Sequence, residues 1–167
     1  PVLSDDDFKR LIDLDYIGRA REVLKLFLDD YTEEELYSCL KGAYTGTFDN
    51  NAPAPLKKLD SGKYVLELWH GPTCAFKDLA LRLLPFLLTA AAKKTGKGRS
   101  VILVATSGDT GKAALEGFRD VEGTDIIVFY PVHGVSPMQK MQMDTQKGGN
   151  VNVCAINGNF DDAQTGV

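Results

Sequence analysis

The stretch SVILVATSGDTGKAALEGF, residues 100–118, joins an apolar run, a loop of glycines and hydroxyl residues, and a segment with helical spacing. Its first part, residues 100–105, is almost continuously apolar, which is typical of a β-strand covered on both faces. The helical segment follows at about residues 110–119. A strand that leads through a loop into a helix is the building unit of α/β proteins. This stretch therefore predicts an α/β fold.

The same alternation continues on both sides of it. Further strands are expected at 64–68, 125–130 and 151–156, and further helices at about 76–95 and 137–147. Strands separated by helices predict a mostly parallel sheet. Pro85 is expected to kink the helix at 76–95, because proline lacks the amide hydrogen that a helix interior needs.

Capping patterns indicate where several helices begin. Ser4 stands before three aspartates, Thr32 pairs with Glu35, and Ser136 pairs with Gln139 across the first turn of an expected helix. In each case a side-chain oxygen can accept a hydrogen bond from a backbone N–H that has no partner within the helix. These patterns predict helix starts near residues 4, 32 and 136.

The chain divides into three parts. Residues 1–48 are expected to form an N-terminal helical region. Residues 49–63, rich in Gly, Asn and Pro, are expected to connect it onward, with a short extended piece at 56–59. Residues 64–167 are expected to form an α/β domain that is incomplete at its C-terminus, because the sequence stops in the acidic start of another helix.

Composition narrows the class of protein. The 167 residues are 44% hydrophobic, and 19 basic residues stand against 23 acidic ones, for a net charge of -4. This favours a folded domain with one sizeable core and argues against a nucleic-acid partner. No apolar run is long enough to cross a membrane, and no basic, apolar leader opens the chain. Three widely spaced cysteines, Cys39, Cys74 and Cys154, indicate reduced thiols in a cytoplasmic protein.

One lysine stands in an unusual place. In HGPTCAFKD, residues 70–78, Lys77 follows an apolar run and is expected just beyond the carboxyl end of the strand at 64–68. A helix start and apolar neighbours would both favour its neutral amine, the form that can join a carbonyl carbon as an imine. A surface lysine stabilised by Asp78 is the alternative at this point.

The loop of the opening stretch is a second candidate. Backbone N–H groups from Gly108 to Gly111 and the hydroxyls of Ser107 and Thr110 could surround an anion. The loop matches neither a P-loop nor the GxGxxG pattern. Asp109 would repel a phosphate, so a carboxylate or a phenolic oxygen is the better ligand. A glycine-containing turn without a ligand is the alternative.

Other polar residues are weaker candidates. His70 and His133 have no carboxylate or cysteine partner at metal-ligand spacing, so no metal site is predicted. His70 could touch a ligand, but a structural role at a strand end is favoured. Ser136 and Lys140 could meet an anion, although helix capping explains Ser136 equally well.

Several blocks taken together resemble one family. LELWHGPTCAFKD (66–78), ATSGDTGKAALEGF (105–118), VSPMQKMQMDTQ (135–146) and NFDDAQ (159–164) are similar, in order and spacing, to the bacterial form of the threonine synthase family. The helical opening LDYIGRAREVLKLFLDDYTEEEL (14–36) is also similar to that family's N-terminal region. The resemblance covers nearly the whole chain, and linked blocks are more specific than a single motif.

The resemblance implies an enzyme of fold type II, the tryptophan synthase β-like class, that depends on pyridoxal 5'-phosphate (PLP). Its α/β part would belong to a mostly parallel αβα sandwich. It also implies the last step of threonine biosynthesis, in which O-phospho-L-homoserine and water give L-threonine and phosphate by γ-elimination and β-addition.

Each site residue is implied by its place in a matching block. Lys77 matches the lysine that binds PLP and moves protons during the reaction. Phe76 and Asp109 match positions next to the cofactor. The residues that match the loop facing the substrate carboxylate are Ser107, Gly108, Thr110 and Gly111.

The chain lacks one element of the family pattern, a second Gly/Asn loop that holds most of the cofactor phosphate. The chain alone is therefore expected to be inactive, and its open sheet could lead to self-association. The alternatives are another fold-type II enzyme, such as a threonine or serine dehydratase, and a non-catalytic α/β binding module. A dehydratase would normally carry asparagine in place of Asp109.

Overall fold

Three helices form the N-terminal part of the protein. The computed structural model describes residues 1–167, and its first elements are α1 (Asp5–Ile12), α2 (Tyr16–Leu24) and α3 (Glu33–Tyr44). The expected N-cap at Ser4 is confirmed in α1, where Ser4 also forms a capping box with Asp7. The expected capping box of Thr32 and Glu35 is confirmed in α3. The helical character of this region is therefore set largely by local side-chain bonds.

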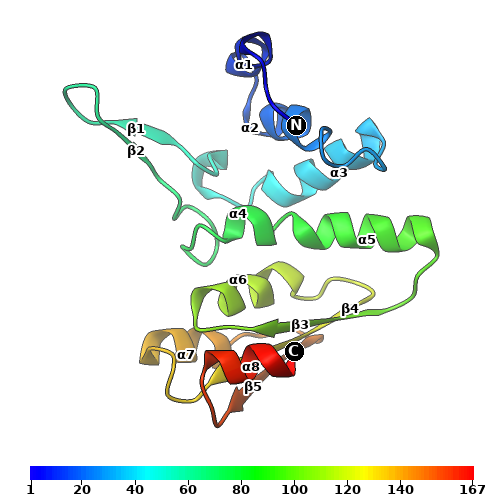
Figure 1. Cartoon of the computed structure of the whole chain (residues 1–167), viewed down its shortest axis with the longest axis vertical. Coiled ribbons are helices and arrows are strands. Elements are labelled where there is room, and N and C mark those ends of the chain that lie inside the picture. Colours follow the sequence, from blue (N-terminus) through cyan, green and yellow to red (C-terminus); the bar gives the residue numbers. More distant parts are fainter.

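Of these helices, α3 packs on two further helices, α4 (Asp78–Leu81) and α5 (Leu84–Thr95), while α2 packs on α3 and α1 lies beyond it (Figure 1). Two tyrosines join the layers. Tyr31 donates a hydrogen bond to the carbonyl oxygen of Leu87 at 2.9 Å, and Tyr44 donates to that of Leu79 at 2.6 Å. Burial raises the pKa of Tyr44, so this donor keeps its proton. The buried residues of this core are Leu36, Cys39, Leu40, Ala43, Tyr44, Phe48 and Leu83.

The segment after Lys77 forms two helices. The helix expected at 76–95 is interrupted at Arg82 and Leu83, and Pro85 lies in the first turn of α5. Proline has no N–H to give to a preceding turn, but it is tolerated at a helix start. The expected interruption at Pro85 is confirmed. None of the helices is both long and apolar enough to cross a membrane.

A separate antiparallel hairpin corrects one expectation. After the short 3-10 helix η1 (Asp49–Asn51), β1 (Leu56–Lys58) pairs with β2 (Tyr64–Leu66), and no strand of the parallel sheet adjoins them. The extended piece expected near 56–59 is present. The strand expected from residue 64 is also present, but its place in the parallel sheet was wrong. Two strands joined by a short turn pair with each other, whereas parallel neighbours need a long crossover.

The parallel sheet has three strands in the order β3-β4-β5. They are β3 (Ser100–Ala105), β4 (Thr124–Pro131) and β5 (Val151–Ile156), so the three expected strands and their parallel pairing are confirmed. β4 lies in the centre and is the most completely buried. β3 is an edge strand, and Val101 and Leu103 are 57% and 45% exposed. The expectation that β3 is covered on both faces was therefore wrong.

Helices lie on both faces of this sheet. α6 (Asp109–Phe118) and α7 (Pro137–Asp144) pack on one face, and α8 (Phe160–Gly166) lies against the other (Figure 1). The fold is thus an α/β arrangement with a helical region at its N-terminal end. The core between α6, α7 and the sheet is formed by Ala114, Leu115, Phe118, Ile126, Val128, Tyr130 and Met143. The division of the chain near residues 48 and 64 stays a prediction, and the hairpin spans the second of these positions.

Candidate functional site

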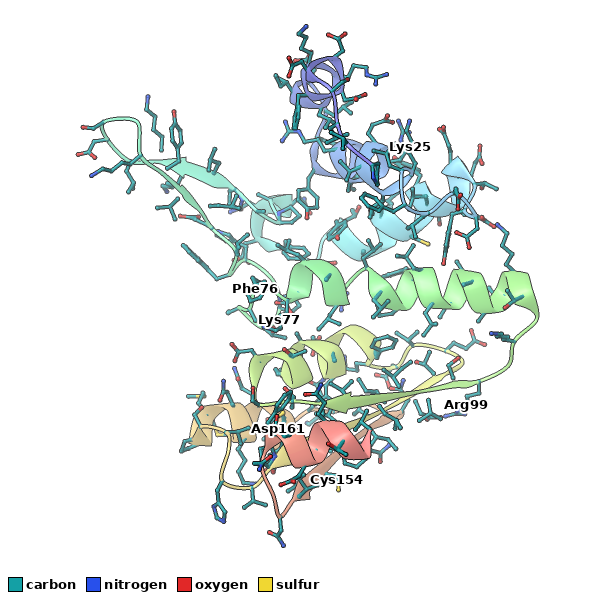
Figure 2. All side chains as sticks on the ribbon, viewed as in Figure 1. Lys25, Phe76, Lys77, Arg99, Cys154 and Asp161 are labelled. Carbon is teal, nitrogen blue, oxygen red and sulfur yellow. The ribbon has the colours of Figure 1, made fainter.

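Two motifs that are distant in the sequence meet at the start of α6. A small cavity of about 90 Å3 lies between the loop before α4 and the first turn of α6. Its lining comes from Thr73, Cys74, Ala75, Asp109, Lys112 and Gln142. Figure 2 shows Phe76 and Lys77 at the start of α4, on the side of the molecule where α6 begins. The structure thus brings the HGPTCAFKD motif beside the glycine loop.

Asp78 holds the loop that carries Lys77. Its side chain is only 1% exposed, and it accepts hydrogen bonds from the Thr73 N–H at 2.8 Å and the Thr73 hydroxyl at 2.6 Å. Gly71 is needed for this closure, because a Cβ there would lie 2.5 Å from the Asp78 Oδ2. Asp78 therefore faces Thr73. The alternative in which Asp78 stabilises a surface lysine does not describe this loop.

Lys77 lies immediately before the first residue of α4. Its side chain is half-buried, and its Nζ lies 4.1 Å from the centre of the Phe76 ring. The strand before it is β2 of the hairpin, so the expected position at the end of a sheet strand was wrong. α4 packs on α6, where Gly117 leaves room for the carbonyl oxygen of Leu81, and this packing brings the loop that carries Lys77 beside the first turn of α6.

The glycine loop is organised by a residue that sequence reasoning missed. Thr106 is 1% exposed, and its hydroxyl oxygen accepts hydrogen bonds from the N–H groups of Gly108 at 3.0 Å and Gly111 at 2.9 Å. These two donors are therefore used within the chain and are not free for the anion that was expected to meet them. The N–H groups of Ser107, Asp109 and Thr110 have no acceptor in the chain. The signal in the sequence was a hydroxyl residue directly before the loop.

The start of α7 contacts the same loop. The expected capping box is confirmed, since Ser136 accepts from the Gln139 N–H and Gln139 Oε1 accepts from the Ser136 N–H. The other end of the Gln139 amide, Nε2, donates to Asp109 Oδ1 at 2.9 Å. Gly108 lies against this amide with a φ of 150°, a region that favours glycine. Residues of α6 and α7 thus meet at Asp109.

Two weaker candidates are engaged elsewhere. Lys140 donates to Asp144 at 2.7 Å and to the Tyr130 hydroxyl at 2.8 Å, and these bonds hold the pKa of its amine above the ordinary value. The expectation that Lys140 meets an anion is therefore not supported by its contacts. Ser136 caps α7.

His70 has partners that the sequence did not indicate. Its ring nitrogens lie 2.8 Å from Glu67 and 3.4 Å from Asp49, and its ring stacks on Trp69. The bond to Glu67 raises the pKa of His70, and it outweighs the opposite effect of desolvation. The sequence analysis considered partners of His70 only at metal-ligand spacing, whereas Asp49 is 21 residues away and is brought to it by the fold.

A larger cavity lies away from both motifs. It has a volume of about 460 Å3 and lies at the amino ends of β3 and β4, with Lys97, Arg99 and Gly123 in its lining. Ligands of open α/β sheets bind at the carboxyl ends of the strands. Arg99 is already paired there with Asp125. The smaller cavity is therefore the better candidate, because it contains the loops with chemically useful residues.

Known proteins are similar to this chain over a range that includes both motifs. No family model matches the chain. The threonine synthase of Pseudomonas aeruginosa is 42% identical over 98% of this chain and 35% of its own length, and that of Haemophilus influenzae is 37% identical over 95% and 35%.

Solved structures agree with the sequence matches. PLP-bound threonine synthase from Brucella melitensis has a TM-score of 0.85 and 38% identity, and the match covers 99% of this chain and 35% of that one. Threonine synthase from yeast has a TM-score of 0.85 and 30% identity, and the match covers 99% of this chain and 35% of the yeast chain. The chain spans about a third of the length of these relatives. Over nearly every one of its residues, the chain is thus similar in sequence and in fold to threonine synthases.

Proposed function

We propose that the full-length protein carrying this chain is a PLP-dependent threonine synthase. It would convert O-phospho-L-homoserine and water to L-threonine and phosphate, acting as a lyase on a carbon–oxygen bond of a phosphate ester. The observation that carries this proposal is the match at 42% identity across 98% of the chain, which includes both loops of the candidate site. A cytoplasmic location and self-association stay predictions.

The residues at the site fit PLP by their chemistry. PLP offers an aldehyde, an aromatic ring and a phenolic oxygen. Lys77 supplies an amine next to an aromatic face, because Phe76 is 59% exposed beside it. The first turn of α6 supplies backbone N–H groups without an acceptor in the chain, which suit an oxygen that carries negative charge. When bound, PLP supplies an electron sink for the carbanions formed on the substrate.

Lys77 is the residue proposed to hold the cofactor and to move protons at the α and β carbons of the substrate. Lys77 follows the lining residues Thr73, Cys74 and Ala75 in the chain but is not itself part of the cavity lining. The amine in the lining is that of Lys112, which donates to Gln146 and lies 3.9 Å from Glu116. Lys77 makes no hydrogen bond or ion pair, and its Nζ lies over the Phe76 ring. This difference supports Lys77 as the proton carrier.

The loop residues have separate proposed roles. Ser107 and Thr110 would bind the substrate carboxylate through their hydroxyls and their backbone N–H groups. These N–H groups donate to no acceptor within the chain. Gly108 and Gly111 would shape the loop, because their N–H groups bond to Thr106. Asp109 would face the cofactor.

The test is an assay of the full-length protein with O-phosphohomoserine. We expect equal amounts of phosphate and threonine to form. Lys77→Ala should abolish the reaction, whereas Lys9→Ala, on the exposed N-terminal helix, should not change it. A parallel incubation with threonine or serine tests the dehydratase alternative. Rapid ketoacid formation without turnover of O-phosphohomoserine would contradict the proposal.

A further inference from the structure

The side-chain amide of Gln139 uses both of its ends. Its Oε1 accepts a hydrogen bond from the Ser136 N–H at 3.0 Å, and its Nε2 donates to Asp109 Oδ1 at 2.9 Å. An amide with one acceptor and two donors has its orientation fixed when both ends are bonded to different elements. Gln139 therefore connects the start of α7 to the first residue of α6.

The same amide also sets the space above the glycine loop. A Cβ on Gly108 would collide first with Nε2 of Gln139 and next with its side-chain carbon. The φ of 150° at Gly108 already favours glycine. The loop is therefore held between the Thr106 hydroxyl, which accepts from the Gly108 N–H, and the Gln139 amide, which lies against the Gly108 α-carbon.

Asp109 has no second partner in the chain. Gln139 engages Oδ1, and no residue donates to Oδ2. Lys112, which lines the same cavity, is bonded to Gln146 instead of Asp109. Since no cation fixes this exposed carboxylate, the neutral amide of Gln139 is what determines its direction.

We infer that Gln139 is a positioning residue that holds Asp109 and the Gly108 turn in the arrangement that the cofactor and substrate require. This inference rests on the proposed function and adds a residue outside both loops to it. Gln139 does not itself line the cavity, and it acts through Asp109, which does.

Gln139→Glu is the sharpest change that the contacts allow. It keeps the shape and the oxygen that caps α7, but it replaces the donor to Asp109 with an oxygen. Two carboxylates would then face each other, and like charges repel. Asp109→Asn supplies the matching second change, because an asparagine amide can donate to the new oxygen. Met138→Ala is the control, since Met138 is the neighbouring residue on α7 and is 60% exposed.

The experiment is a double-mutant cycle on the full-length protein, with PLP titration, steady-state kinetics and thermal unfolding. With Asp109 present, we expect Gln139→Glu to weaken PLP binding by about fivefold and to lower kcat by about tenfold, with little change in KM. In the Asp109→Asn background the same change should alter each value by less than about twofold. Met138→Ala should leave all of them unchanged.

The outcomes separate this inference from the proposed function. Equal effects of Gln139→Glu in both backgrounds, or an effect on the unfolding temperature alone, would overturn the positioning role while phosphate release still upheld the function. If Gln139→Glu weakened PLP binding only while Asp109 was present, and no variant turned over O-phosphohomoserine, the positioning role would be upheld and the proposed function overturned. A protein that binds no PLP would overturn both.

Discussion

The carboxylate of Asp78 closes a ring with Thr73, from which it receives one backbone and one hydroxyl hydrogen bond while remaining 1% exposed. A buried carboxylate is costly unless its oxygens are bonded, so this pair can persist only if the loop between the two residues keeps its shape. Lys77 precedes Asp78 directly. The position of its amine is therefore a consequence of where its neighbour is bonded.

Gly71→Ala should disturb this ring. The new Cβ would lie 2.5 Å from the Asp78 Oδ2. The Asp78 carboxylate cannot move away without losing its hydrogen bonds to Thr73. We expect a loss of about 1–3 kcal/mol in the free energy of unfolding, measured with denaturant, together with weaker PLP binding. Gly98→Ala is the matched control, because a Cβ there meets no atom within 4 Å. Equal effects of the two changes would contradict this account of the ring.

Thr106→Val should loosen the glycine loop. Valine has the same shape but leaves the buried Gly108 N–H without its acceptor, and the Gly111 N–H with only the Gly108 carbonyl oxygen at 3.1 Å. Each unsatisfied buried group costs about 1–3 kcal/mol, so the protein should unfold at lower denaturant concentration. Thr106→Ser keeps the hydroxyl and should retain most of the stability. If serine were as harmful as valine, packing of the methyl group would be the cause.

His70 should make stability depend on pH. Its bond to Glu67 raises its pKa above the ordinary value of 6.5, so the protonated ring stabilises the folded chain. This contribution is fully present below pH 6.5 and is lost as the pH rises through the raised pKa.

The measurement compares the thermal unfolding of His70→Gln with that of the unmodified protein at pH values from below 6.5 to above the raised pKa of His70. The unmodified protein should be the more stable at low pH, and the difference should shrink as the pH rises. His133→Gln, at an exposed position without a hydrogen bond, serves as the control. A difference that grew with pH would show that the sign is wrong.

Lys77 should carry the cofactor in the full-length protein. Borohydride reduction makes the link between PLP and its lysine permanent, and peptide mass spectrometry should then find the added mass on Lys77. Lys112 is the internal comparison, because it lines the cavity but is bonded to Gln146. A label on Lys112 with Lys77 unmodified would falsify the assignment.

The 167-residue chain alone should bind PLP weakly, lack synthase activity and associate. Its site offers Lys77 and one helix start, without the second phosphate loop that the family resemblance implies. β3 and β5 are both edge strands, and Val101 and Leu103 are exposed on the sheet, as is Cys154, labelled in Figure 2. Such edges and apolar faces favour association.

PLP titration and sedimentation, run beside the full-length protein, provide the measurement for the isolated chain. We expect a PLP dissociation constant at least about tenfold larger, since the loss of one charge-assisted hydrogen bond is enough for that change. Comparable affinity and turnover in the two proteins would mean that the second loop is dispensable.

The sequence predicted best those features that depend on near neighbours. The strands at 100–105, 125–130 and 151–156 were found because a continuous apolar run needs no partner to be recognised. The capping boxes of α3 and α7 were found because both of their members lie within one helical turn.

The sequence could not predict contacts between residues that are distant along the chain. The apolar pattern at 64–68 indicated a strand but not its partner, and the partner proved to be β1. The bond between Gln139 and Asp109 spans 30 residues, and that between Asp49 and His70 spans 21. No spacing rule predicts such pairs, because they exist only after α6, α7 and η1 have been packed. The motifs located the candidate site, and packing determines which of its donors are free.

The two tyrosine hydroxyls that join the helical layers also bear on where the chain tolerates a break. The turn between β1 and β2 includes Ser61 and Gly62 at positive φ, is exposed, and carries no core residue. A protease that cuts there would leave two pieces joined by the hairpin pairing, the Tyr31 and Tyr44 bonds, and the core around Leu83. Cleavage at this turn is therefore expected to leave the two pieces associated.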